Sequence, residues 1–562
     1  MVIINPFEET CTTIVNDQLK LRDYYEAHKH QIWVGYNSRM YDQWILKGIL
    51  LGHNAYDVSD WIINQGNQGW AYSFGMNEVK LNNYDCMSKF YSLKQLEGFM
   101  GNDMEETSVP FDIDRPLTPT ELQQTIKYCT HDVEETMEVF LRTKATFDAH
   151  ISLIKAFDLP LSAISKTQAQ LSAMALGCVK HDWLDEWDIQ IVDTLQIKKY
   201  ADVIEWFKAS AQLPYDNKTK YNQSLSINVC GVPHVFGWGG LHGAPDKPLH
   251  RKGLILHVDV TSFYPSIMIR YDMLSRNVKD KSVYKKIYDT RVQLKAEGKK
   301  AEQAPYKIIL NSTYGICKDP KSTAYDPRQA NNICVNGMLL LLDLLEHLEG
   351  HCDLIQSNTD GLIIQIPDTD EAFDAVDDIC YEWEQRTGMH LGFDIITEIW
   401  QKDVNNYIFR FEDGSIERKG AYVKPLNDLD NDLPIINKAL VEYMVNGVPV
   451  EQTINQCDDL KPFQKIVKIS GKYECGWHNG IKYSQKTFRV FASKYADSSF
   501  MGKVKIKDGK ESIEKFANTP DHCFFFNNDV NEVKVDDVPE LDKQWYIDLA
   551  NKRLAQFGVK GG

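Results

Sequence analysis

The sequence lacks the features that would place a protein in or across a membrane. No run approaches the ~20 apolar residues of a spanning helix, and the opening residues, MVIINPFEETCTT, form no basic-then-apolar leader. Paired metal-binding cysteines are also missing, because none of the twelve cysteines falls in a C-x-x-C pair. These absences predict a cytoplasmic protein without a zinc ribbon, in the host cell if the gene is viral, with reduced and mostly buried thiols.

A net positive charge is absent as well. The formal net charge is −17, which is unexpected for a protein that binds nucleic acid, but net charge says little about a local surface. Residues 276–307 carry ten basic side chains against four acidic ones, whereas residues 368–398 carry ten acidic side chains and one basic one. The first segment suits a polyanionic ligand, and the second is interpreted as a solvated acidic face.

The first half of the sequence contains a regular order of secondary-structure signals. Residues 1–150 alternate strand-like and helix-like segments and end in a long helix from about residue 120, with Thr118 or Thr120 as its N-cap. We expect a helical stretch from there to about residue 212. The glycine-rich segment VFGWGGLHGAP, residues 235–245, then predicts a domain junction.

The second half predicts the order strand, paired helices, helix, hairpin, helix. The strand GLILHVDV ends at TSFYPSI, where Pro265 is expected to force a turn, and two helices follow with a break at Gly298. A long apolar helix covers about residues 333–350. The segment CDLIQSNTDGLIIQI has the pattern of a hairpin with a polar turn. There are no internal repeats and no low-complexity segments.

Two aspartates stand at rigid positions in this order. Asp259 ends the predicted strand, and Asp360 lies in the turn of the predicted hairpin. Nucleotide transfer to a 3′-hydroxyl needs two divalent ions about 3.5–4 Å apart. Magnesium takes one or two carboxylates together with water and phosphate oxygens. An aspartate in a hairpin turn is more often a turn former than a ligand, so the surrounding residues decide the interpretation.

Three segments around these aspartates resemble the motifs of family B DNA polymerases. DVTSFYPS, residues 259–266, resembles D-x-x-S-L-Y-P-S with Phe263 in place of the usual leucine. KIILNSTYG, residues 307–315, matches K-x-x-x-N-S-x-Y-G without a departure. SNTDG, residues 357–361, resembles Y-x-D-T-D-S but departs from it on both flanks of the T-D core. The three occur in the family's order, and the resemblance is strong over residues 236–422.

The resemblance implies catalytic roles for the matching residues. Asp259 and Asp360 would each bind both metal ions, and the Val260 carbonyl would complete one site. Tyr264 would lie under the incoming sugar and exclude a 2′-hydroxyl. The implied cofactors are two Mg²⁺ ions, for which Mn²⁺ could substitute.

Further residues would bind the nucleotide. Arg291 and Lys295 are four residues apart and share a helix face. Together with Lys307 they would place three cations on two helices, aimed at the triphosphate. The implied nucleotide ligands are Tyr264, Arg291, Lys295, Lys307, Asn311, Tyr314 and Gly315.

The resemblance also implies the architecture and the partners. We expect an α/β and α+β multidomain protein, in which an RNase H-like exonuclease-type domain precedes a right-hand polymerase. The expected ranges are 1–150 for the exonuclease-like domain, 151–235 for a helical connector, 236–275 and 318–425 for the palm, 276–317 for the fingers, and 426–562 for the thumb. The implied partners are primer–template DNA, dNTPs and other phage replication proteins.

The hairpin departs from the family at Asn358, where an acid is usual. Asparagine keeps an oxygen acceptor and loses a charge, so we expect altered metal preference or rate rather than inactivity. Two further segments resemble primer–template contacts. These are Gly239 and Gly240 in FGWGG, and Lys419 and Tyr422 in KGAY.

The N-terminal region resembles the family's proofreading domain in two motifs. Asn37 and Asp42 match N-x-x-x-[FY]-D, and Tyr128 and Asp132 match Y-x-x-x-D. The D-x-E that should supply two more ligands is not found upstream of Asn37. We therefore expect a missing first strand, relics of a metal site, and weak or absent 3′→5′ exonuclease activity.

The spacing of the motifs also bears on priming. Protein-primed members carry insertions within the palm, and the intervals from Asp259 to Lys307 and from Asn311 to Asp360 leave little room for them. No terminal-protein partner is therefore expected, and the compact layout resembles polymerases of phages of low-GC Gram-positive bacteria. The alternatives are an RNase H-like nuclease whose second half only holds DNA, and a non-catalytic DNA-binding protein.

Overall fold

The chain folds into two compact units. The computed structural model describes residues 1–559 except 88–90, 105, 111–112, 114 and 421. Unit 1 comprises Met1–Ser165, Leu426–Ala439 and Pro449–Ala550, and unit 2 comprises Lys166–Pro425, Leu440–Val448 and Asn551–Gly562. The protein is thus of mixed α/β, multidomain construction, as expected. The finer division into connector, palm, fingers and thumb stays a prediction.

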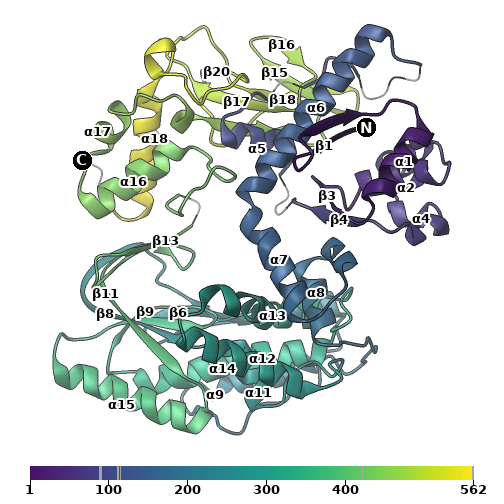
Figure 1. Cartoon of the computed structure of the whole chain (residues 1–562). Helices are drawn as coiled ribbons and strands as arrows, with labels where there is room; N and C mark the ends of the chain where they lie inside the picture. The colour runs from purple at the N-terminus through teal and green to yellow at the C-terminus, as the bar shows by residue number, and fades with distance from the viewer. Residues whose placement is uncertain (88–90, 105, 111–112, 114, 421, 560–562) are drawn as a thin grey trace. The chain divides into compact units, whose positions relative to one another are not determined.

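The N-terminal part of unit 1 holds two small sheets and their helices (Figure 1). Strands β1 and β2 pair antiparallel, and β3 and β4 pair parallel. The elements are β1 (Val2–Asn5), β2 (Thr10–Thr13), α1 (Gln18–His28), β3 (Ile32–Gly35), α2 (Asp42–Leu50), α3 (Ala55–Ile63), η1 (Gly69–Ala71), α4 (Phe74–Glu78), β4 (Asn82–Asp85), α5 (Leu93–Met100), α6 (Pro119–Arg142), α7 (Lys144–Ala156) and η2 (Leu161–Ser165).

The long helix predicted from residue 120 is α6, and its N-cap is Thr118. The Thr118 side chain accepts a hydrogen bond from the backbone N–H of Glu121, whose carboxylate accepts the Thr118 N–H in return. This capping box satisfies two donors that a helix start otherwise leaves open. Thr143 ends α6, and α7 continues the chain as a separate helix.

The C-terminal part of unit 1 is mainly β-structure. A three-stranded sheet has the order β14-β17-β20, and a four-stranded sheet has the order β16-β15-β18-β19. The elements are α17 (Val450–Asn455), η3 (Lys461–Phe463), β14 (Lys465–Lys468), β15 (Cys475–His478), β16 (Ile481–Tyr483), β17 (Thr487–Ala492), β18 (Gly502–Lys507), β19 (Lys510–Lys515), β20 (Cys523–Phe525) and η4 (Val535–Asp537), and two helices, α16 (Pro434–Asn446) and α18 (Lys543–Gln556), contribute residues to both units.

A buried arginine joins the two parts of unit 1. Arg489, on β17, has no exposed surface and donates to the backbone carbonyls of Gly98 and Asn102 beside α5 at 3.3 and 2.8 Å. Its Nε donates to Gln464 Oε1 at 3.0 Å. Burial lowers the pKa of Arg489 to about 10. The carbonyl oxygens therefore compensate a desolvated cation, and losing one partner would leave a donor unsatisfied.

Unit 2 is built on a nine-stranded sheet with the order β13-β12-β11-β8-β10-β9-β7-β6-β5. Its central strand β8 buries Leu256, Val258 and Val260 on one face and turns His257 and Asp259, both half-buried, to the other. The strands are β5 (Ser224–Val229), β6 (Val232–Gly237), β7 (His242–Gly243), β8 (Leu249–Val260), β9 (Asp353–Ser357), β10 (Gly361–Gln365), β11 (Leu391–Asp403), β12 (Asn406–Phe411) and β13 (Ile416–Lys419).

The helices of unit 2 confirm the predicted pair, the break at Gly298 and the long apolar helix. Gly298 has a φ of 72°, a left-handed conformation that separates α12 from α13. Figure 1 shows α14 and α15 on the same side of the sheet. The helices are α8 (Gln168–Ala175), α9 (Ala201–Ala211), α10 (Asn217–Tyr221), α11 (Phe263–Arg270), α12 (Lys281–Ala296), α13 (Lys300–Lys318), α14 (Pro327–Leu348) and α15 (Asp370–Thr387).

The expected turn at Pro265 is wrong. Pro265 lies in the first turn of α11, where its missing N–H has no helical partner to lose. The chain turns three to four residues earlier, at Thr261 and Ser262, and Ser262 has a φ of 50°. A strand-to-helix turn therefore follows Asp259 directly.

The expected helical stretch to about residue 212 is also partly wrong, because residues 179–200 contain no described helix. Polar side chains of α14 bind this segment instead. Asn332 Oδ1 accepts the N–H of Gln190, and Asp343 Oδ1 accepts the N–H of Gln196, at 2.9 and 2.8 Å. The full stripe on the helix is Asn332, Asn336, Asp343 and Glu346, which accept amides from Gln190 through Tyr200.

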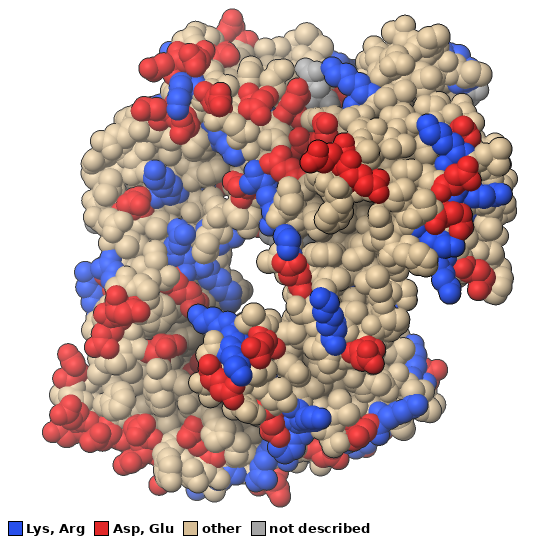
Figure 2. Space-filling model, in the orientation of Figure 1, with Lys and Arg blue, Asp and Glu red and all other residues tan. Residues whose placement is uncertain are grey.

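The surface agrees with the acidic segment of the sequence. Acidic side chains gather over α15, at the lower left of Figure 2, and this is the solvated acidic face that was expected. All twelve cysteines are free thiols. Among the described helices, none combines the length and apolar character that crossing a membrane would require.

Candidate active site

The sheet of unit 2 brings Asp259 and Asp360 together. Gly361, the first residue of β10, pairs with Asp259 at the end of β8. The N–H of Val260 donates to the carbonyl of Asp360 at 2.8 Å. The two aspartates are 101 positions apart in the sequence, and the antiparallel register places them on adjoining strand ends. The predicted hairpin is therefore present, and it brings the Asp259 and Asp360 carboxylates close together.

The hairpin turn is held by its own backbone and by a close approach at Gly361. The N–H of Asn358 donates to the carbonyl of Gly361 at 2.8 Å, and Asn358 Oδ1 accepts the N–H of Thr359 at 2.9 Å. A Cβ at Gly361 would lie 2.9 Å from the carbonyl oxygen of Val258 and 3.4 Å from Asp259 Oδ1. Only glycine allows this turn to approach β8 so closely.

The position of Asn358 explains one part of the departure from the family. Its amide oxygen forms the turn, which a carboxylate oxygen would do equally well. Asn358 therefore supports the turn without adding a negative charge to the hollow that it shares with Asp259 and Asp360.

The carboxylates lie in a hollow of about 200 Å³. Burial, and then the charge of Asp360, raise the pKa of Asp259 to about 6. Among the described residues no basic side chain forms an ion pair with either aspartate, although Lys295 lies near enough to lower the pKa of Asp259. Two carboxylates that destabilise each other's charge and have oxygen ligands to offer fit a divalent cation.

Aromatic side chains form the apolar part of the site. Tyr264, in the first turn of α11, contacts Tyr314 of α13 with ring centroids 4.7 Å apart. Burial strongly raises the pKa of the Tyr264 hydroxyl. Gly337 of α14 backs this ring, since a Cβ there would lie 3.0 Å from Tyr264 Cε1. The ring is thus fixed from two sides.

The predicted cations lie on α12 and α13 as expected. Arg291 donates through Nη1 to Ser262 Oγ at 2.6 Å, and burial lowers its pKa. Its Nε is buried without a hydrogen-bond partner among the described residues. Lys295 is exposed. Arg291 therefore keeps an unused donor beside the turn that follows Asp259.

One face of α13 carries the other predicted nucleotide ligands. Lys307, Asn311 and Gly315 are spaced four apart, so they share a helix face, and all three are exposed. Nothing lies within 4 Å of where a Cβ of Gly315 would stand. The face is open to a ligand along its length.

The predicted primer–template residues are placed differently from one another. Lys419, at the end of β13, lines the same hollow as the aspartates. Gly240 lies against the hairpin turn, since its Cβ would be 3.1 Å from Thr359 Oγ1. Gly239 accepts a hydrogen bond from Cys334 Sγ through its carbonyl at 2.9 Å. Tyr422 instead lies under the Arg553 guanidinium, 4.5 Å from the ring centre, and is not among the residues that line the hollow.

Sequence reasoning missed Tyr407 and Glu417. The Tyr407 hydroxyl donates to Glu417 Oε1 at 3.1 Å, and Lys419 Nζ lies 5.7 Å from the Tyr407 ring centre. All three residues line the hollow. The run of tyrosine, isoleucine and phenylalanine in NYIFRF could have predicted strand β12 from β-propensity, but not which of its residues faces the aspartates.

Unit 1 contains a second group of aspartates. Desolvation raises the pKa of Asp42 to about 6, and the charges of Asp85 and Asp132 contribute to the rise. Asp42 opens α2, Asp85 ends β4, and Asp132 lies on α6 beside the predicted Tyr128. Asp85 was not predicted. Asn37, with a φ of 56°, lies in the turn that precedes α2.

A lysine lies beside one member of this second group. Lys94 of α5 lies 3.2 Å from Asp132 Oδ1 and 2.9 Å from Glu97 Oε2, and its ammonium is 4.8 Å from the Tyr128 ring centre. Burial opposes the charge of Lys94, but Glu97 and Asp132 outweigh it and raise its pKa. Among the described residues, no cluster of three or more histidine, cysteine or acidic side chains has an arrangement suited to a metal ion. Asp132 thus has an ion-pair partner, whereas neither aspartate of the pair in unit 2 has one among the described residues.

Comparisons with known proteins give a limited result. No family model matches the chain, and no curated protein matches it. Among solved structures, the chain is similar to the family B DNA polymerase from the hyperthermophilic archaeon Pyrobaculum calidifontis. The sequences are 15% identical, the match covers 98% of this chain and 73% of that chain, and the TM-score is 0.43.

Proposed function

We propose that this protein is a template-directed DNA polymerase that adds dNTPs to a primer 3′-hydroxyl. The observation that carries the proposal is the pairing of Gly361 with Asp259, which joins two carboxylates, with Lys295 of α12 near enough to lower the pKa of Asp259. The proposal includes a role in phage or prophage replication in the host cytoplasm, with DNA, dNTPs and other replication proteins as partners and no terminal protein.

Asp259, Asp360 and the Val260 carbonyl would hold two Mg²⁺ ions, with Mn²⁺ as a possible substitute. When bound, these ions would neutralise the reacting phosphates and activate the primer hydroxyl. The protein's own residues would bind and orient the nucleotide. Phosphoryl transfer depends largely on such positioning and charge stabilisation.

The individual roles follow from the contacts. Arg291, with its free Nε, and the exposed Lys295 and Lys307 would bind the triphosphate. The fixed ring of Tyr264 would support the sugar and exclude a 2′-hydroxyl. Asn311, Tyr314 and Gly315 would line the nascent base pair, and the template and primer would contact Gly239, Gly240, Lys419 and Tyr422.

Proofreading is proposed to be weak or absent. In unit 1 the ammonium of Lys94 lies 3.2 Å from Asp132, which belongs to a predicted nuclease motif. The ammonium would compete there with a metal ion. Purified protein should leave a 3′-mismatched primer largely intact in magnesium. Rapid removal of the mismatched nucleotide would contradict this part of the proposal.

Primer extension with magnesium and four dNTPs tests the polymerase activity. Wild type should extend the primer, and Asp360→Ala should lose at least ~1,000-fold, or about 4 kcal/mol of barrier. Asp353→Ala is the matched control, since Asp353 is an exposed aspartate at the far end of the same hairpin. Equal extension by wild type and Asp360→Ala would exclude the site. An RNase H-like nuclease or a DNA-binding protein would bind DNA without extending it.

A further inference from the structure

The outer strand of the nine-stranded sheet has an unprotected edge. β5 is last in the sheet order and pairs only with β6, without a register shift. Its sequence, SLSINV, contains none of the lysines or prolines that usually protect an exposed edge. No described strand covers it. The edge is therefore available to another extended segment.

The hairpin geometry identifies the backbone groups on this edge. Cys230 and Gly231, with φ of 51° and 80°, form a two-residue turn between β5 and β6. In such a hairpin the pair beside the turn is hydrogen-bonded, and pairs alternate from there. The N–H and C=O groups of Ser224, Ser226 and Asn228 consequently point away from β6. All three residues are exposed.

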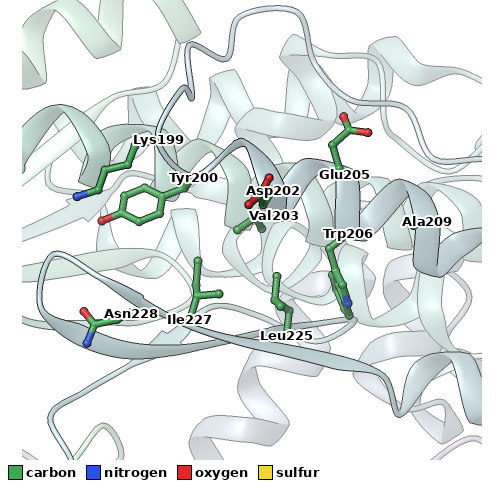
Figure 3. Close-up of a pocket in the computed structure, with 10 residues that line it drawn as sticks. All are labelled: Lys199, Tyr200, Asp202, Val203, Glu205, Trp206, Ala209, Leu225, Ile227 and Asn228. Atoms are coloured by element: carbon green, nitrogen blue, oxygen red, sulfur yellow. The ribbon is translucent and has the colours of Figure 1, made fainter.

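A hollow of about 580 Å³ lies between this strand and α9 (Figure 3). Leu225 and Ile227 point toward α9, and Trp206 of α9 points toward the strand. Val203 adds to the apolar lining, while Asp202 and Glu205 are exposed on α9. A strand added beside β5 would direct every second side chain toward this hollow.

The charges select the kind of partner. Asp202 and Glu205 line the hollow, and Glu346 and Glu349 bind the backbone or side chain of Lys199 at its end. The basic side chains among these neighbours are Lys199, paired with Glu349, Lys208, paired with Glu205, and the exposed Lys198, whose backbone N–H donates to Glu346. Four acids against three bases leave a small negative excess, and Asp202 has no ion-pair partner among the described residues. A second copy pairing through its own β5 would bring two such acidic surfaces together, and nucleic acid would be repelled.

We propose that the β5 edge and the α9 hollow bind an extended segment of a partner protein that carries arginine or lysine at the positions facing α9. The backbone would pair with Ser226 and Asn228. The aliphatic stems of the basic side chains would cover Leu225, Ile227 and Trp206 while their charged ends reach Asp202 and Glu205.

The probe is the labelled peptide acetyl-RTVTRTVTR-amide, titrated into the full chain and followed by fluorescence anisotropy. Saturable binding is expected, with protection of the Ser226 and Asn228 amides from hydrogen exchange. Ser226→Pro removes an outward N–H without removing a bond to β6, and should weaken binding at least tenfold. The double variant Asp202→Lys/Glu205→Lys should do the same.

Two controls keep the result specific. Asp377→Lys changes an exposed acid on α15 and should leave binding unchanged, and a peptide with glutamate in place of arginine should bind at least tenfold more weakly. Circular dichroism checks that each variant is folded, so the result does not depend on polymerase activity. Absence of saturable binding, or binding that ignores Ser226→Pro, overturns the proposal. A dimer broken by Ser226→Pro would also overturn it, because the occupant would then be a second copy.

Discussion

Units 1 and 2 both gather aspartates, and they balance the negative charge in different ways. In unit 2, Asp259 and Asp360 lie on adjoining strand ends, and neither has an ion-pair partner among the described residues. In unit 1, Asp132 is paired with Lys94, which Glu97 also holds. Both groups raise the pKa of one aspartate to about 6. Clustering and a raised pKa are therefore shared, and the difference between the two groups is the lysine that lies beside Asp132.

The largest change in the stability of unit 1 is expected from Lys94→Met. Glu97 has no exposed surface, so loss of Lys94 leaves its buried charge with only His131, 3.7 Å away, and should destabilise unit 1 by about 3–5 kcal/mol. The double variant Lys94→Met/Glu97→Gln should recover much of that loss. Denaturant unfolding followed by hydrogen exchange in α5 and α6 measures both. A loss below about 1 kcal/mol in the single variant would show that Lys94 does not compensate the acids.

The next effect concerns the close approach in unit 2. Gly361→Ala would place a Cβ 2.9 Å from the Val258 carbonyl, which must displace the hairpin from β8. We expect a loss of about 1–3 kcal/mol in unfolding free energy, together with primer extension reduced at least tenfold. Gly350→Ala is a poor control because its φ is positive, so Gly315→Ala serves for stability, with nothing within 4 Å of its Cβ. Wild-type extension by Gly361→Ala would mean that the aspartates need not be joined.

A smaller effect is expected from Asn358→Asp. The carboxylate would keep the bond to the Thr359 N–H and add a negative charge beside Asp259 and Asp360. Metal binding should tighten, and the ratio of magnesium-dependent to manganese-dependent extension should change by about two- to tenfold, that is, up to about 1.4 kcal/mol. Titration of each metal in primer extension measures the ratio. An unchanged ratio would limit Asn358 to forming the turn.

The smallest effect is a difference between the two units in how their stability depends on pH. Hydrogen bonding to Glu97 raises the pKa of His131 in unit 1, so its contribution is present below pH 6.5 and lost as pH rises through the folded pKa. Burial lowers the pKa of His234 in unit 2, where its ring bonds Ser357 Oγ at 2.7 Å, so unit 2 loses stability as pH falls below 6.5.

Hydrogen exchange between pH 5.5 and 8.5 reports each unit separately. His131→Gln should reduce the stability of unit 1 more at pH 5.5 than at pH 8.5, by less than about 1 kcal/mol. His234→Gln should make the stability of unit 2 depend less on pH below 6.5, whatever the substitution does to stability at neutral pH. Dependences of the same sign in both units would contradict the two assignments.

The sequence predicted the elements that local pattern controls. The hairpin around Asp360, the helix that carries Lys307 and Asn311, and the Thr118 cap are all present. These predictions succeeded because turn residues, periodicity and capping act within a few positions of each other.

Contacts between distant residues could not be read in this way. Asp85, Lys94 and Tyr407 reach their sites only through folding, and nothing in their neighbours distinguishes them from ordinary surface or core residues. Pro265 was expected to lie in a turn, but it lies in the first turn of helix α11. Where that helix begins depends on where strand β8 ends, and the sequence around Pro265 does not show this. Residues 179–200 were expected to be helical, and the sequence near them gives no sign that they are not. The side chains that bind them in a non-helical conformation belong to α14, more than 130 positions away.

The polar stripe of α14 also restricts the length of the segment that it binds, residues 190–200. Gln190, Val192 and Gln196 each meet a particular acceptor on the helix, so the extended segment is matched to α14 residue by residue. One residue inserted between Val192 and Gln196 would move every later amide away from its acceptor, which is not how a surface loop normally responds to insertion. This segment should therefore tolerate changes of side chain more readily than changes of length, and proteolytic sensitivity of single-residue insertion variants would show whether it does.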